Sequence, residues 1–217
     1  MFRDTDAEVI ADWMLSEVNN GIEGTDAKPG FLKCSSNGNP GATNSNYARI
    51  LGTALAQRES GLSVYTHTDC VTRLGLWQKA IFDAEGVDPS RIAYGHSGTT
   101  CDEHYLRTLS RDGSFICFDQ LTWYNDEPHT QLLAKLMKTD LYKQIIISCD
   151  AALRSDYALV GSKQLRDRTK NEFVGMYTRR NEIFLKLIPN LLKLGVDEER
   201  INEVFTLNPR RFFGEKI

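Results

Sequence analysis

The chain has 217 residues, a formal net charge of −3, and 41% hydrophobic against 25% charged residues. This length suits one domain of ordinary size, and the composition is that of a globular protein. The small net charge gives no basis for a nucleic-acid or membrane partner, and no apolar run approaches the roughly 20 residues of a membrane-spanning helix. The acidic, amphipathic start is not a signal peptide, so we expect a soluble, cytoplasmic protein.

Five short apolar runs along the chain predict buried parallel strands. Each is four or five residues long, rich in β-branched or aromatic residues, and bounded by Gly, Ser, Asp or Asn, which is typical of such strands. The expected strands are residues 30–34, 62–66, 92–95, 114–118 and 144–148.

Amphipathic segments with helical spacing separate these runs, and further helices are expected after the last one. Alternating strands and helices indicate the α/β class with a parallel sheet. A closed (β/α)₈ TIM-type barrel needs eight strands. We therefore expect a partial barrel of about five βα units with a helical carboxy-terminal end, forming a single domain over residues 1–217.

Four ionisable residues lie where the predicted strands end: Lys33, His67, His96 and Asp150. The carboxyl ends of parallel strands converge on one face, where imidazole and carboxylate groups could bind a divalent metal such as zinc. Each residue also has an ordinary structural interpretation. Asp150 could cap the following helix, Lys33 could extend to water, and a single histidine at a strand end is seldom a ligand.

Five segments resemble the phosphotriesterase family of the amidohydrolase superfamily, whose members include aryldialkylphosphatases and lactonases. They run in order through almost the whole chain and read GFLKCSSNG, VYTHTD, GVDPSRIAYGHSGTT, KQIIISCD and VFTLNPRRFF. The resemblance implies a barrel enzyme that hydrolyses ester bonds in lactones, carboxylic esters or phosphoesters. The implied cofactor is Zn²⁺ or another divalent metal, and the implied partner is a small-molecule substrate.

The resemblance also assigns roles to single residues. Lys33 would be carboxylated and would bridge two metals, His67 and His96 would bind one metal, and Asp150 would bind the other. In the family, the counterpart of Asp150 also accepts the proton of the hydroxide that the metals share, so Asp150 is the expected catalytic residue. Gln120 falls at the position of a proton-relay histidine, which favours substrates other than phosphotriesters.

The sequence departs from the family in one further respect, because it contains no His-x-His motif, which completes the second metal site at the family's first strand. Aligned to the family, the chain begins in the helix before the fourth strand and is expected to be incomplete at its amino-terminal end. The alternative function is therefore that of a truncated, catalytically inactive member that binds one metal or none and acts by interaction. In that case, strands 30–34 and 144–148 would be exposed sheet edges that could pair in a homo-oligomer.

Other residues of metal-binding or aromatic type received structural interpretations. Cys34 and Cys149 adjoin proposed ligands, and because side chains alternate along a strand we expect them to face the helices. The five cysteines, an odd number with no CxxC spacing, indicate neither a disulfide framework nor a zinc ribbon. Trp123 and Tyr124 could line an apolar substrate pocket or could equally be packing residues.

Overall fold

The computed structural model describes residues 6–36, 43–121, 127–150 and 181–215. These residues contain a five-stranded sheet in which all neighbours are parallel and the strands follow chain order. The five predicted strands are confirmed to within two residues at either end. They are β1 (Leu32–Ser35), β2 (Val64–His67), β3 (Ile92–Gly95), β4 (Phe115–Phe118) and β5 (Ile145–Ile147).

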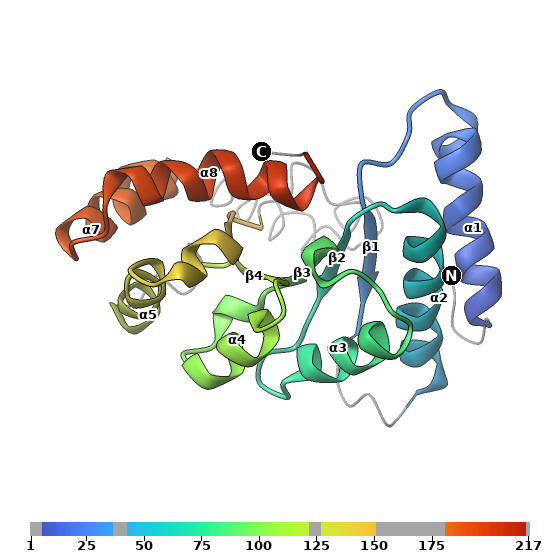
Figure 1. The fold of residues 1–217 in the computed structure, drawn as a ribbon, viewed down its shortest axis with the longest axis horizontal. Coiled ribbons are helices and arrows are strands. Elements are labelled where there is room, and N and C mark those ends of the chain that lie inside the picture. Colours follow the sequence, from blue (N-terminus) through green and yellow to red (C-terminus); the bar gives the residue numbers. More distant parts are fainter. Residues whose placement is uncertain (1–5, 37–42, 122–126, 151–180, 216–217) are drawn as a thin grey trace, which may run out of the picture.

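Seven α-helices lie in the described part of the chain and flank the sheet (Figure 1). In Figure 1, α1 lies outside α2 at the right of the view, beside β1. Helices α7 and α8 lie at the upper left. The helices are α1 (Ala7–Asn20), α2 (Asn44–Ser60), α3 (Leu74–Ala84), α4 (Glu103–Ser110), α5 (Glu127–Met137), α7 (Ile188–Lys193) and α8 (Glu198–Phe212).

Local signals in the sequence set several helix boundaries. The carboxylate of Asp102 accepts a hydrogen bond from the Tyr105 backbone N–H and so caps α4. Gly61 ends α2 in the left-handed conformation with φ of 67°, which a residue without a Cβ adopts at little cost. Such boundaries fix where each connecting segment returns to the sheet.

The two faces of the sheet carry different apolar clusters, as side-chain alternation requires. The face toward the helices includes Val64, Ile92, Tyr94 and Ile116 in one large cluster. The opposite, inner face carries a smaller cluster built from Ala93, Phe115, Cys117 and Phe212, with Tyr65 and Ile146 packed against it. The expectation for Cys34 and Cys149 is confirmed, since both belong to or pack against the helix-side cluster.

Helix α8 covers the amino-terminal end of the strands. The Asn208 amide donates to the carbonyls of Tyr142 and Ile145, at 2.7 Å each. Phe212 packs edge to face on the rings of Tyr65 and Phe115. The carboxyl ends of the strands therefore lie at the opposite end of the sheet from this closure.

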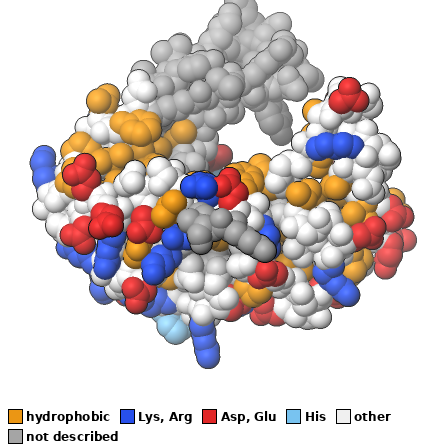
Figure 2. All heavy atoms as spheres, turned by 45° about the horizontal axis from the view of Figure 1, so that its top comes forward, with side chains coloured by type: hydrophobic (Ala, Val, Ile, Leu, Met, Phe, Trp, Pro, Cys, Tyr) orange, Lys and Arg blue, Asp and Glu red, His pale blue; other side chains and the backbone are white. Residues whose placement is uncertain are grey.

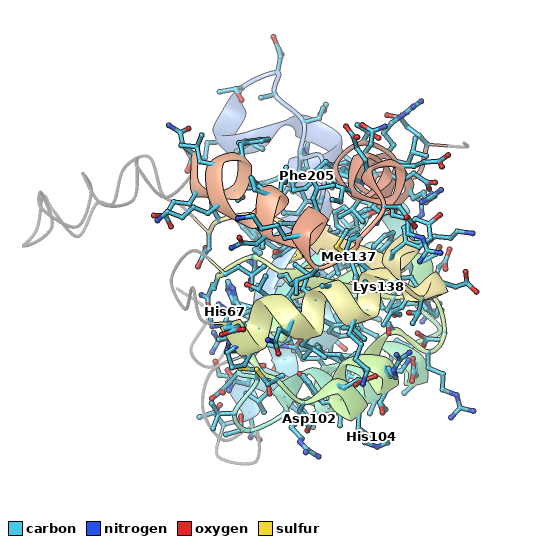
Figure 3. The ribbon with its side chains drawn as sticks, turned by 90° about the vertical axis from the view of Figure 1, so that its left-hand side faces the viewer. His67, Asp102, His104, Met137, Lys138 and Phe205 are labelled. Carbon is cyan, nitrogen blue, oxygen red and sulfur yellow. The ribbon has the colours of Figure 1, made fainter. Side chains whose placement is uncertain are left out.

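None of the described helices is long and apolar enough to cross a membrane. The helices also pack on one another. Figure 3 shows Phe205 of α8 above Met137 at the end of α5, and both residues contribute to the helix-side core. On the face shown in Figure 2, acidic and basic side chains are interspersed, in keeping with the small net charge. The α/β class and the partial TIM-type barrel predicted from the sequence are confirmed.

Candidate metal and catalytic site

Two histidines meet at the carboxyl ends of β2 and β3. His67 is the last residue of β2, and the strand register pairs it with Gly95, so His96 follows directly beside it. Their rings lie edge to face with centroids 4.4 Å apart. Gly95 permits this approach, because a Cβ there would overlap the Thr66 carbonyl oxygen and lie 2.6 Å from the Tyr65 ring. The predicted convergence of the two imidazoles is confirmed.

A buried carboxylate, Asp119, fixes the position of His96. Its Oδ1 lies 3.0 Å from the Nδ1 atom of His96, and the His96 backbone N–H donates to both of its oxygens at 3.0 and 3.1 Å. The Tyr65 hydroxyl donates to Oδ2 at 2.5 Å. Because a carboxylate only accepts, Nδ1 carries the proton and Nε2 keeps the lone pair that a metal would bind.

The sequence alone did not single out Asp119 as a site residue. The signal that could have found it is its position, since it directly follows β4, just as His96 directly follows β3. A carboxylate next to a ligand histidine orients the ring and raises the basicity of its free nitrogen. Burial raises the pKa of the Tyr65 phenol well above its usual range, with neighbouring Cys117 and Asp119 acting in the same direction. The phenol therefore stays a hydrogen-bond donor to Asp119.

Lys33 lies on β1 beside this pair. Its Nζ donates to the Thr66 carbonyl at 3.1 Å and lies 4.4 Å from the centre of the Tyr65 ring. Burial lowers the pKa of Lys33, while the charges of nearby groups, including Asp119 and Asp150, act in the opposite direction. A lowered pKa increases the neutral amine fraction, which is the form that reacts with carbon dioxide.

The pKa of His67 is lowered as well. Burial is the largest cause, and the neighbouring His96 and Lys33 act in the same direction. Both effects disfavour the imidazolium, so His67 is held in the neutral form that metals bind.

Asp150, three residues beyond β5, is tied to the rest of the site by a side-chain amide. The Gln120 Nε2 donates to Asp150 Oδ2 at 3.0 Å, and the Thr99 hydroxyl donates to Gln120 Oε1 at 3.0 Å. Asp150 is exposed and has a positive φ of 45°. It lines a cleft of about 430 Å³ on the inner face of the sheet, together with Phe31, Lys33, Tyr65, His96, Asp119 and Ser148.

The remaining candidates fall elsewhere. Trp123 and Tyr124 lie outside the described residues. His104 is exposed on α4, and Figure 3 shows it beside Asp102 and apart from His67. His129 lies on α5, with its Nε2 2.7 Å from the Thr99 carbonyl. Both histidines therefore lie on helices and not at a strand end.

The donor set fits a divalent metal only if Lys33 is carboxylated. No three His, Cys, Asp or Glu side chains of the described residues group as metal ligands would. The available donors are the imidazoles of His67 and His96, and the third neighbouring group is the Lys33 amine, a cation in its ordinary form. Carboxylation would convert that cation into an anionic oxygen donor beside two neutral imidazoles, which is a ligand set that zinc accepts.

The parallel sheet in chain order is that of a partial (β/α)-barrel, and polar residues gather at the carboxyl ends of its strands, where such barrels carry their sites. Comparison with known proteins identifies the group. The sequence model of the phosphotriesterase family matches residues 2–213, so the chain belongs to that family.

Three relatives illustrate the similarity. The chain is 30% identical over 215 residues to an aryldialkylphosphatase of Saccharolobus solfataricus, covering 98% of this chain and 66% of that protein. It is 29% identical over 211 residues to a phosphotriesterase homology protein of Mycobacterium tuberculosis (strain H37Rv), covering 95% and 61%. A phospho-furanose lactonase of Mycoplasmopsis synoviae is 27% identical over 140 residues, which is 60% of this chain and 36% of that protein. The chain thus spans just under two thirds of the length of the first two.

Proposed function

We propose that the protein is a metal-dependent hydrolase acting on ester bonds of small molecules, with lactones and carboxylic esters favoured over phosphotriesters. The observation that carries the proposal is the meeting of His67 and His96 beside Lys33 at the carboxyl ends of neighbouring strands. Similarity to an aryldialkylphosphatase and to a phospho-furanose lactonase supports ester bonds as the substrate class.

His67, His96 and carboxylated Lys33 would hold one metal, with zinc as the expected ion, and Asp150 is the proposed ligand of a second metal position that Lys33 would share. A divalent metal there would supply Lewis-acid polarisation of the ester oxygen and a water of lowered pKa, about 7 in zinc hydrolases. The protein's own part is to keep the His67 imidazole neutral and to fix the free nitrogen of His96. Burial of His67 and the contact of His96 with Asp119 support that part.

Asp150 is the proposed proton acceptor during attack on the ester. It is exposed, so a proton taken up there can pass to solvent. Gln120 holds the Asp150 carboxylate through its amide, and Thr99 holds Gln120. Neither an amide nor an aliphatic hydroxyl ionises near neutral pH, so this chain of contacts orients Asp150 without acting as an acid–base relay.

The substrate would bind in the cleft lined by the Lys33, His96 and Asp150 side chains. Phe31 and Tyr65 give its floor an aromatic surface, which suits the apolar part of an ester or lactone. Gln120, which donates a hydrogen bond to the cleft residue Asp150, is a proposed substrate contact. Trp123 and Tyr124 remain sequence-based proposals for the same role.

Turnover assays on the 217-residue chain test the proposal. The protein is supplied with zinc and bicarbonate and assayed with an aryl carboxylic ester, a lactone and a phosphotriester. Metal-dependent turnover is expected, and it should be abolished in Asp150→Asn and His96→Ala but retained in His104→Ala. Absence of metal-dependent turnover, or turnover that survives His96→Ala, would refute the proposal and favour the catalytically inactive alternative.

A further inference from the structure

Tyr65 occupies an unusual place on the inner face of the sheet. The strand register places it next to Lys33, with its ring under the lysine ammonium and its hydroxyl on Asp119. The side chains of His67 and Tyr65 share one face of β2, because they are two residues apart on a strand. Tyr65 thus contacts both Lys33 and Asp119, and it is not itself a proposed metal ligand.

Asp119 is 2% exposed, and the hydrogen bonds of its carboxylate divide between the two oxygens. Oδ2 receives the Tyr65 hydroxyl and the His96 backbone N–H, and Oδ1 receives the same backbone N–H and the His96 ring. Among the described residues, the Tyr65 hydroxyl is the hydrogen-bond donor to this carboxylate that comes from outside residue 96. Without it, rotation of the carboxylate about its own axis would be opposed by the contacts from His96 alone.

We propose that Tyr65 is a positioning residue of the site, whose hydroxyl holds Asp119 in the orientation that keeps the proton of His96 on Nδ1 and its Nε2 open toward a metal. This inference rests on the proposed function for its link to metal binding. The tautomer of the His96 ring can be measured in the metal-free protein, so the role of Tyr65 is tested separately from metal binding. Tyr65 acts through another residue, so its removal should weaken metal binding less than removal of a direct partner of the ligand.

The test uses Tyr65→Phe, which removes only the hydroxyl and keeps the ring against Lys33. The matched control is Tyr94→Phe, which removes a hydroxyl from a fully buried tyrosine on the helix side of neighbouring β3. Thermal unfolding establishes that both variants fold. Nitrogen-15 shifts of the His96 ring in metal-free protein, recorded at a pH of about 9 where an ordinary imidazole is neutral, report the tautomer. Calorimetric zinc titration reports the affinity.

Tyr65→Phe should move the His96 ring nitrogens away from the Nδ1–H pattern and weaken zinc binding about threefold to tenfold, below the 10–100-fold typical of a direct outer partner. Tyr94→Phe should change neither quantity. Unchanged nitrogen shifts in Tyr65→Phe, or equal changes in both variants, would overturn the inference. Failure of the wild type to bind zinc would refute the proposed function, and the nitrogen shifts would still decide the role of Tyr65.

Discussion

His67 and His96 lie edge to face at 4.4 Å between ring centroids, and the strand register rather than the loop geometry brings them together. His67 ends β2 opposite Gly95, so the next residue after β3 must emerge beside it. Two imidazoles at this separation cannot both be protonated without mutual repulsion. The pair is therefore suited to sharing one metal ion and poorly suited to acid.

Folding stability should fall in mild acid because of His67. Its pKa in the folded chain is lowered from 6.5 by burial and by His96, so the unfolded chain binds this proton more readily. The resulting stability is fully present above pH 6.5 and is lost as pH falls below that value. Urea unfolding of metal-free protein at pH about 7.5 and about 5.5 should give a smaller loss in His67→Gln than in wild type. An equal loss in both would contradict this assignment, and His104→Gln should match wild type.

Substitution of Gly95 should damage both the fold and the site. In Gly95→Ala, the new Cβ would meet the Thr66 carbonyl oxygen and the Tyr65 ring, so β2 and β3 would have to separate. Such overpacking costs about 1–3 kcal/mol of unfolding free energy. Gly30→Ala is the control, since a Cβ there meets no atom within 4 Å. Denaturant unfolding that found the two variants equally stable would show that the close approach at Gly95 is not required.

The cysteines should differ in their reactivity toward a thiol alkylating reagent. Burial raises the pKa of Cys34 to about 12, and burial also raises the pKa of Cys117. Cys101 is exposed at the start of the segment before α4. Mass spectrometry after brief treatment of folded protein should find Cys101 modified and the two buried thiols intact. Modification of Cys34 as fast as Cys101 would contradict its placement in the helix-side core.

Self-association through a sheet edge is predicted at high protein concentration. Within the described part of the chain, β1 and β5 each pair on one side only, and Phe31 before β1 is 39% exposed. Sedimentation velocity should show association that grows with concentration and decreases in Phe31→Lys. Val71→Lys, at an 87% exposed position away from the strands, should not reduce it. A monomer at every concentration would refute this prediction.

The strands and the paired histidines were predictable because both depend on short-range patterns. A run of β-branched residues between turn residues marks a parallel strand, and the residue after each strand must lie on the carboxyl face. Asp119 was missed because its role depends on the backbone N–H and ring of His96, which only the packed sheet places within reach. The link from Gln120 to Asp150 was equally hidden, since it joins two loops whose paths no periodicity defines.

Calorimetric titration of the chain with zinc in the presence of bicarbonate tests the central claim most directly. Close to one zinc per chain is expected, because His67, His96 and carboxylated Lys33 form one complete donor set. His67→Ala should lose more than about 100-fold in zinc affinity, beyond the cost of removing an outer partner, and His104→Ala should lose none. Two tightly held zinc ions, or binding that His67→Ala leaves unchanged, would contradict it.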